Sequence, residues 1–203
     1  MNETPSDIRT EIADLGEFGL IDHLTKLFIP TNTSTVKSIG DDSAVLNPEN
    51  KHVVITTDMM VEGVHFDLAY FPLKHLGYKA IVSNLSDVYA MNAIPVQVTV
   101  SISVSNRYSV EALEVLYEGI RLACESYQVD LVGGDTTASL RGLVISVTAI
   151  GIQEAEKICY RNGAKPGDLV CVSGNLGSAY LGLQILEREK QIFLSDQTIQ
   201  PDL

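Results

Sequence analysis

Four acidic sites follow apolar or small-residue segments of this sequence. They are Asp41 and Asp42 in SIGDD, Asp58 in VVITTD, Asp87 in IVSNLSD and Asp135 in VDLVGGD. An isolated carboxylate is costly to bury, so such groups normally pair with a cation or take up a proton. Each site alone has a plainer interpretation as a turn or helix-cap residue. Their shared setting favours a different hypothesis, in which the fold gathers these carboxylates around bound cations.

Basic side chains are scarce near these carboxylates. Between residues 38 and 104 the only lysines or arginines are Lys51, Lys74 and Lys79. The hydroxyls of Thr56 and Thr57 stand beside Asp58, and oxygen ligands of this kind suit Mg²⁺. Magnesium usually takes only one or two protein carboxylates and completes its shell with water and substrate phosphate. Several aspartates therefore predict several metal ions and a highly charged substrate, such as a nucleotide with a second phosphate.

Two common phosphate-binding motifs are absent from the sequence. It contains neither GxxxxGK[ST] nor a GxGxxG that follows a strand. Phosphates would be held mainly by metal, with help from backbone N–H groups around Gly133 and Gly134. His65 follows Asp58 in the TTDMMVEGVHF segment, and a lone histidine is more often structural or a substrate contact than a general base. No catalytic side chain is expected, because a phosphate monoester is mostly dianionic at pH 7 and can itself attack.

Alternating and helical patterns predict the elements that position these residues. Residues 96–104 alternate between apolar and small polar side chains, which is typical of a half-buried strand. The order of the expected strands and helices along the chain predicts the α/β (α+β) class, with helices packed on one face of a largely antiparallel or mixed sheet. Further strands are expected at 52–58, 129–132, 143–151 and 169–173. Helices are expected at 16–28, 73–92 and 109–127, and a last helix runs from after the turn SGNLG to about Lys190.

Composition excludes several classes of protein. The chain has 26 acidic and 14 basic residues and a net charge of −12, which argues against a nucleic-acid-binding surface. The odd number of cysteines, without CxxC spacing, argues against a disulfide framework and fits a reducing cytoplasm. No signal peptide is recognised at the N-terminus, and no apolar run reaches the roughly 20 residues that span a bilayer. A cytoplasmic protein that binds neither membrane nor nucleic acid is expected.

A Gly/Pro-rich turn, RNGAKPGD at residues 161–168, is a candidate domain boundary. We expect an N-terminal α/β domain over residues 1–155. Residues 156–203 are expected to begin a second α/β domain that is truncated in this chain.

Five segments together resemble one known family. They are, in chain order, SIGDDSAVL, TTDMMVEGVHF, GYKAIVSNLSDVYAMNAIP, GGDTT and RNGAKPGDLVCVSGNLG. In this combination the sequence resembles the thiamine-monophosphate kinase family, within the aminoimidazole ribonucleotide synthetase superfamily. The resemblance implies ATP-dependent phosphorylation of thiamine monophosphate to thiamine diphosphate. The transfer would run directly between phosphates, assisted by several Mg²⁺ ions.

The resemblance also implies roles for single residues. His65 matches a substrate contact, and Tyr117, Gly134 and Arg161 match nucleotide contacts. The N-terminal domain of the family dimerises through its strands, so the resemblance implies a homodimer, with residues 96–104 and 143–151 as candidate surfaces. The residues that match metal ligands are Asp42, Thr56, Thr57, Asp58, Asp87 and Asp135.

The family carries further acidic motifs that this chain lacks. Its C-terminal domain adds motifs of the DISDG and GGEDY kind, and neither occurs here. The 203-residue chain is therefore expected to be an incomplete enzyme. Two alternatives remain open: a non-catalytic, dimerising, nucleotide-binding module, or another ATP-dependent enzyme of the same superfamily with a different acceptor.

Overall fold

The computed structural model describes residues 10–39, 45–160 and 162–195. The chain divides into two compact units, of which the first comprises residues 1–67 and 71–160 and the second comprises residues 68–70 and 161–203. The domain boundary expected at residue 155 stays a prediction.

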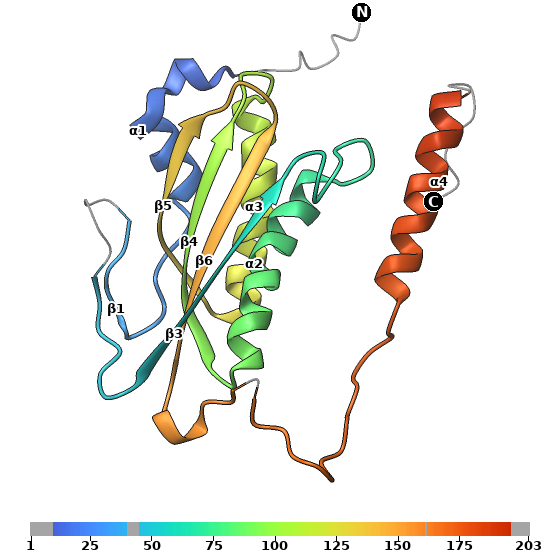
Figure 1. The fold of residues 1–203 in the computed structure, drawn as a ribbon. Helices are drawn as coiled ribbons and strands as arrows, with labels where there is room; N and C mark the ends of the chain where they lie inside the picture. The colour runs from blue at the N-terminus through green and yellow to red at the C-terminus, as the bar shows by residue number, and fades with distance from the viewer. Residues whose placement is uncertain (1–9, 40–44, 161, 196–203) are drawn as a thin grey trace, which may run out of the picture. The chain divides into compact units, whose positions relative to one another are not determined.

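A four-stranded mixed sheet forms the centre of the first unit (Figure 1). Its strands are β3 (His52–Val61), β4 (Ile94–Val104), β5 (Asp130–Ala138) and β6 (Leu143–Gln153), in the spatial order β3-β6-β4-β5. Strand β6 runs antiparallel to both of its neighbours, and β4 runs parallel to β5. The predicted mixed sheet is therefore confirmed.

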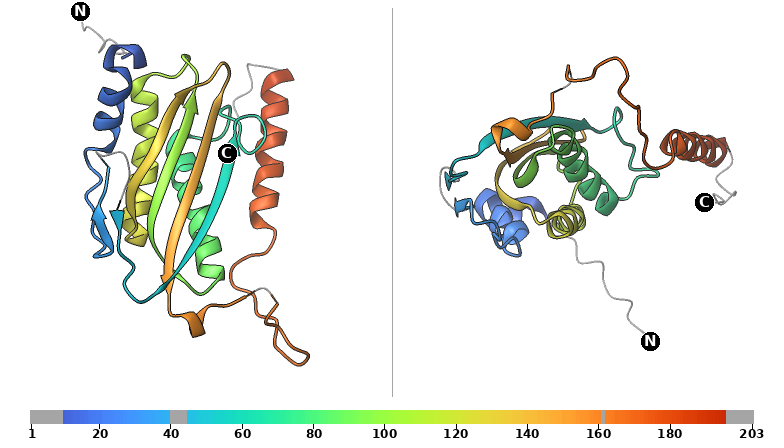
Figure 2. Two further views of the ribbon diagram at one scale, coloured as in Figure 1. Left: turned by 60° about the vertical axis from the view of Figure 1, so that its left-hand side comes forward. Right: turned by 90° about the horizontal axis from the view of Figure 1, so that it is seen from below.

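Two helices cover one face of this sheet (Figure 2). Helix α2 (Leu73–Ala90) joins β3 to β4, and α3 (Val110–Tyr127) joins β4 to β5. Helix α1 (Ile12–Thr25) packs beside α3. Helices on one face were also predicted, and this too is confirmed.

The core lies between the sheet and these helices. Alternate residues of β6 are buried, as the apolar pattern of this segment requires when only one face is covered. Along β3 and β6, the other side of the sheet, here called the open face, carries half-exposed or exposed side chains. The largest fully buried side chains of this core, from α2, α3 and the sheet, include Leu76, Ile81, Leu85, Ile102, Leu113, Leu116, Ile120, Leu143 and Ile145.

Two strands continue beyond the acidic residues at which, or before which, they were expected to end. Strand β3 extends three residues past Asp58 to Val61, and β5 continues past Asp135 to Ala138. Asp58 stands opposite Val147 of β6, and Asp135 is aligned with Ser101 of β4. Ladder pairing is made by the backbone, so it continues past a polar side chain that is exposed on the sheet surface.

The smaller elements differ from the expected boundaries in places. Helix α1 begins at Ile12 rather than residue 16, and it is interrupted at Gly16, whose φ is +66°. A separate two-stranded antiparallel sheet is formed by β1 (Thr35–Lys37) and β2 (Val45–Leu46). A short 3₁₀ helix, η1 (Ala155–Lys157), follows β6.

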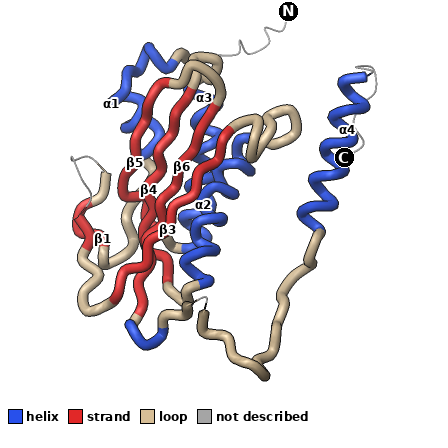
Figure 3. The backbone as a smooth tube through the Cα atoms, viewed as in Figure 1, coloured by secondary structure: helices blue, strands red, loops and turns tan. Residues whose placement is uncertain are grey.

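The second unit contains one helix in its described part, α4 (Ser178–Ser195). The strand expected at residues 169–173 was wrong, because the structure shows this segment as loop (Figure 3). Leu169 and Val170 are 90% and 95% exposed. A strand requires a neighbour for its backbone groups, and no described residue pairs with this segment.

Among the described helices, none is both long and apolar enough to cross a membrane.

Gly119 is required where α2 and α3 pack against each other. A Cβ atom at Gly119 would lie 1.9 Å from the carbonyl oxygen of Lys74, and one at Gly77 would lie 2.0 Å from that of Leu116. Alanine normally stabilises a helix by about 1 kcal/mol over glycine. We expect Gly119→Ala instead to lower the free energy of unfolding by about 1–3 kcal/mol, because the helices must separate. Urea unfolding measures the change.

Gly19 of α1 provides a matched control for this prediction. A Cβ at Gly19 would meet Leu15 at 3.5 Å, an ordinary contact. Gly19→Ala should therefore leave stability unchanged or raise it slightly. A Gly119→Ala variant that is as stable as Gly19→Ala would show that the helix contact tolerates a methyl group.

Candidate functional site

Three of the predicted metal ligands meet where β3 packs on α2. The Thr56 hydroxyl donates a hydrogen bond of 3.0 Å to Oδ2 of Asp87. Asp58 stands two residues further along β3 and on the same face of the sheet as Thr56. Both carboxylates are exposed. We call Thr56, Asp58 and Asp87 the β3–α2 site.

Asn84 fixes the two elements of the β3–α2 site against each other. Its side-chain oxygen accepts a hydrogen bond of 3.0 Å from the backbone N–H of Asp58, and its amide donates to the carbonyl of Ala80 at 2.9 Å. Asn84 is 1% exposed, so breaking these bonds would leave buried polar groups without partners. The sequence did not single out Asn84. Its only signal is a polar residue among the apolar positions of the helix.

The two lysines of α2 are engaged with other side chains. Lys74 pairs with Glu118 at 2.6 Å, and Lys79 lies over the ring of Phe71. Within the described ranges, neither carboxylate of the β3–α2 site forms an ion pair with lysine or arginine. Their negative charge is thus left for another cation.

The remaining predicted metal ligands lie elsewhere or outside the described residues. Thr57 points to the open face, where its hydroxyl donates to the Val147 carbonyl at 3.0 Å and accepts from Thr148 at 3.1 Å. Asp135 lies on β5, at the opposite edge of the sheet from β3. Three strand spacings separate these edges by roughly 14 Å. Asp42 lies outside the described residues.

The described residues alone do not complete a metal site. In residues 10–39, 45–160 and 162–195, no group of three or more histidine, cysteine, aspartate or glutamate side chains is placed to hold a metal ion. The β3–α2 site supplies two carboxylates and a hydroxyl, all hard oxygen donors. This donor set fits Mg²⁺, which completes its shell with water and phosphate oxygen.

The predicted nucleotide contacts are spread over two places. Gly134 lies on β5, and a Cβ there would lie 1.8 Å from the carbonyl oxygen of Val100, so only glycine fits beside β4. Tyr117 lies on α3 and is 7% exposed. Arg161 lies outside the described residues.

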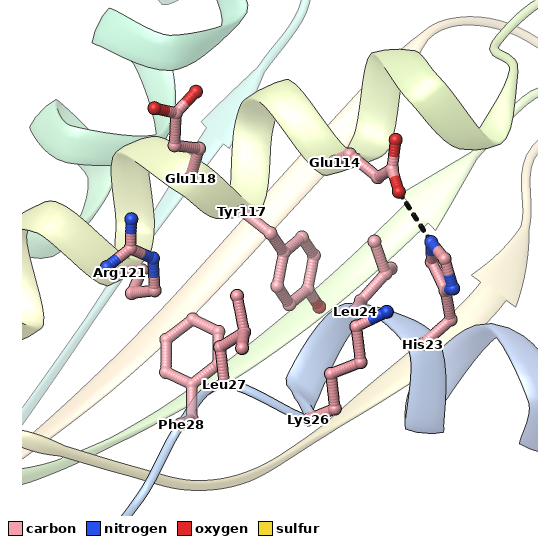
Figure 4. A pocket seen from close by; sticks show the side chains of 9 residues that line it. All are labelled: His23, Leu24, Lys26, Leu27, Phe28, Glu114, Tyr117, Glu118 and Arg121. Carbon is pink, nitrogen blue, oxygen red and sulfur yellow. Dashed lines mark hydrogen bonds and ion pairs between the residues drawn. The ribbon is translucent and has the colours of Figure 1, made fainter.

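Tyr117 lines a shallow pocket between α3 and the chain that follows α1 (Figure 4). The pocket has a volume of about 200 Å³. The Tyr117 ring packs edge-on against Phe28 at 6.3 Å, and burial raises the pKa of its hydroxyl to about 12. Charged side chains surround this apolar floor, among them the pair His23–Glu114 at 2.5 Å. The pocket therefore combines an aromatic floor with a polar rim.

His65 follows β3 and is exposed. The ring Nδ1 of His65 accepts a hydrogen bond of 3.0 Å from the backbone N–H of Val61. The backbone N–H of His65 donates to the Val61 carbonyl at 2.9 Å. Because Nδ1 is an acceptor, the neutral ring carries its proton on Nε2. The side chain thus offers one N–H donor at the surface.

A second residue that the sequence analysis missed is Asp130, at the start of β5. Asp130 is 4% exposed, and its carboxylate accepts hydrogen bonds from the backbone N–H groups of Thr31 and Asn32, at 2.7 and 3.0 Å. The hydroxyls of Thr31 and Thr35 also donate to it, at 3.2 and 2.6 Å. Asp130 therefore fixes the loop that leads into β1. The many donors of the TNTST segment were the available signal, because they require an acceptor.

The part of the chain that forms the sheet and its two helices matches a known protein family. Residues 40–153 match the family model described as AIR synthase related protein, N-terminal domain. The chain belongs to this family. The matched residues include α2, α3 and all four strands of the sheet. The β3–α2 site therefore lies within an AIR synthase related N-terminal domain.

Several thiamine-monophosphate kinases of known sequence or structure resemble this chain. Thiamine-monophosphate kinase from Bacillus subtilis (strain 168) is 38% identical over 176 residues, covering 86% of this chain and 54% of the relative. The crystal structure of thiamine-monophosphate kinase from Stenotrophomonas maltophilia K279a has a TM-score of 0.73 at 34% identity, covering 85% of this chain and 54% of that one. The resemblance inferred from the motifs is confirmed.

A third relative of this AIR synthase related chain was solved with ligands. It is described as AaThiL complexed with AMPPCP and TMP, and it matches with a TM-score of 0.65 and 38% identity. The match covers 90% of this chain and 56% of that chain. This chain thus spans about half the length of the curated relatives and solved structures it matches.

Proposed function

We propose that the protein containing this chain transfers the terminal phosphoryl group of ATP to thiamine monophosphate and forms thiamine diphosphate. The observation that carries the proposal is the 38% identity, over 90% of this chain, to a protein complexed with AMPPCP and TMP. AMPPCP is an ATP analogue, and TMP is the phosphate acceptor. Both substrates of the proposed reaction are therefore ligands of a similar protein.

The β3–α2 site supports this reaction through its charge and its donor atoms. The acceptor phosphate is mostly dianionic at neutral pH, so the protein must position two anions rather than abstract a proton. Mg²⁺, when bound, would supply neutralising charge between the two phosphates. We assign Thr56, Asp58 and Asp87 to its binding. On the motif match, Asp42, Thr57 and Asp135 are assigned to further Mg²⁺ ions. Asp87 is held in place by Thr56 at 3.0 Å.

The remaining assignments concern the two substrates. His65 presents its Nε2–H to thiamine monophosphate. Tyr117, Gly134 and Arg161 contact the nucleotide, and the pocket beside Tyr117 has an aromatic floor of the kind that suits a base.

The experiment that tests the proposal uses the natural full-length protein. It is incubated with ATP, thiamine monophosphate and Mg²⁺, and thiamine diphosphate is measured by chromatography. Product that requires both substrates and is abolished by a chelator is expected. Binding of AMPPCP without product would indicate a nucleotide-binding module instead. Product from another phosphate acceptor alone would indicate a different kinase of the same superfamily.

We also propose that the protein is a homodimer joined through the open face of the sheet. Ile55, Met59 and Val53 of β3 alternate along this face and are 64%, 56% and 45% exposed. A row of apolar side chains on a sheet surface favours a partner that covers it.

Ile55→Asp is expected to convert the dimer into a monomer, because a charge would be buried without a partner in the interface. Sedimentation velocity measures the change in mass. Leu140→Asp is the control, since Leu140 is fully exposed in the connection between β5 and β6 and lies off this face. A monomeric wild type, or a dimeric Ile55→Asp variant, would contradict the proposed interface.

A further inference from the structure

Glu62 lies directly after β3 and connects three segments of the first unit. Its carboxylate accepts hydrogen bonds from the Tyr108 hydroxyl and the Leu143 N–H, both at 2.8 Å, and from the Arg107 guanidinium. The backbone N–H of Glu62 donates to the Leu143 carbonyl at 3.0 Å. The carboxylate therefore takes the place of a strand carbonyl and extends the β3–β6 pairing by one residue.

The carboxylate of Glu62 is firmly held in its charged form. Its side chain is 18% exposed, and a Cβ at Gly142 would approach Oε2 to 3.0 Å, so glycine is needed beside it. Burial would raise the pKa of Glu62, but the hydrogen bonds from Arg107, Tyr108 and Leu143 outweigh burial and lower it. Charge-assisted hydrogen bonds of this kind are stronger than neutral ones. Glu62 is thus a fixed point at the base of the turn that follows β3.

This turn carries His65. Gly63 adopts a φ of +79°, and its N–H donates to the Phe66 carbonyl at 2.8 Å. Phe66 is 5% exposed and closes the turn. The bond from the Val61 N–H to Nδ1 of His65 spans this turn, whose first residue after β3 is Glu62.

We propose that Glu62 is a positioning residue that holds His65 as an Nε2–H donor toward the substrate. The identity of the substrate, thiamine monophosphate, rests on the proposed function, whereas the tautomer of His65 does not. Glu62 touches neither substrate in this proposal and acts through the turn that it anchors.

The first test reads the tautomer directly. The full chain, labelled with ¹⁵N-histidine, is studied by long-range ¹H–¹⁵N NMR at a pH where its histidines are neutral. Wild type should show His65 as the Nε2–H tautomer, and Glu62→Ala should show a mixture of both tautomers. Glu62→Gln keeps an oxygen for the Leu143 N–H and should show a smaller change of the same sign, so it decides the outcome if Glu62→Ala fails to fold.

Glu114→Gln is the matched control for this test, because Glu114 lies 2.5 Å from Nε2 of another histidine, His23. It should alter the His23 signals and leave those of His65 unchanged. A wild-type Nε2–H signal for His65 in the folded Glu62 variants would overturn the proposal, whatever the kinetics show.

The second test measures substrate binding in the natural full-length protein. Glu62→Ala is expected to raise the KM for thiamine monophosphate about tenfold, with a much smaller effect on the KM for ATP. Combining it with His65→Ala should add little, since both variants remove one donor. A tautomer change without any change of KM in Glu62→Ala and His65→Ala would support the positioning role and overturn the proposed contact of His65 with substrate.

Discussion

Asp87→Asn is expected to lower kcat for phosphorylation of thiamine monophosphate by about 100-fold or more. An amide removes one of the charges that the β3–α2 site offers to Mg²⁺, and charge stabilisation is the main catalytic contribution in direct phosphoryl transfer. Asp58→Asn should have an effect of similar size. The measurement is steady-state product formation in the natural full-length protein over a range of Mg²⁺ concentrations.

The fold should survive this substitution, which separates a loss of metal binding from unfolding. Asp87 is exposed, and an asparagine there still offers an oxygen to the Thr56 hydroxyl. Its free energy of unfolding should therefore change by less than about 0.5 kcal/mol. Asp22→Asn, at an exposed position of α1, is the control and should retain wild-type activity. Wild-type rates in Asp87→Asn and Asp58→Asn would remove the β3–α2 site from the reaction.

The sheet and its helices could be predicted because their patterns are local. The alternation of residues 96–104 and 143–151 follows from burying one face of a strand, and both segments are strands in the structure. The ends of β3 and β5 could not be predicted in the same way. Their last residues are paired by β6 and β4, which are distant in sequence.

The pairing inside the candidate site was only partly visible in the sequence. The residue types of Asp58 and Asp87 suggested a shared role, but their closeness depends on α2 packing against β3 through Asn84. The strand order places Asp135 at the far edge of the sheet, and a sequence does not specify strand order. Residue type therefore suggested a chemistry, whereas the geometry depends on contacts between segments that are distant in sequence.

Asp130 is a structural residue whose contacts could likewise not be predicted from the sequence. Its substitution has the second of the two largest effects that we expect. Its carboxylate receives four hydrogen bonds from the segment containing Thr31, Asn32 and Thr35. We expect Asp130→Ala to lower the free energy of unfolding by about 3 kcal/mol, because buried N–H and O–H donors would lose their acceptor. Asp130→Asn should lower the free energy of unfolding nearly as much, since the NH₂ group of the new side chain would face other hydrogen-bond donors. Urea unfolding at neutral pH measures both.

Glu154→Gln is the control for this prediction. Glu154 forms an exposed ion pair with Lys157 at 2.7 Å, and such pairs contribute about 0–1 kcal/mol. Equal stabilities of Asp130→Asn and Glu154→Gln would show that the loop does not depend on the carboxylate.

The pH dependence of stability distinguishes the charge of Asp130 from its shape. Burial would raise the pKa of Asp130, but the hydrogen bonds from Thr31, Thr35 and Asn32 outweigh it and lower the pKa in the folded protein. The unfolded chain has the ordinary value of about 3.9. The charged carboxylate therefore stabilises the fold fully above that value, and this contribution is lost as the pH falls through the lower, folded pKa. The difference in unfolding free energy between wild type and Asp130→Asn should accordingly be constant near neutral pH and shrink below about pH 4. A difference that persists undiminished in acid would mean that hydrogen-bonding shape, and not charge, holds the loop.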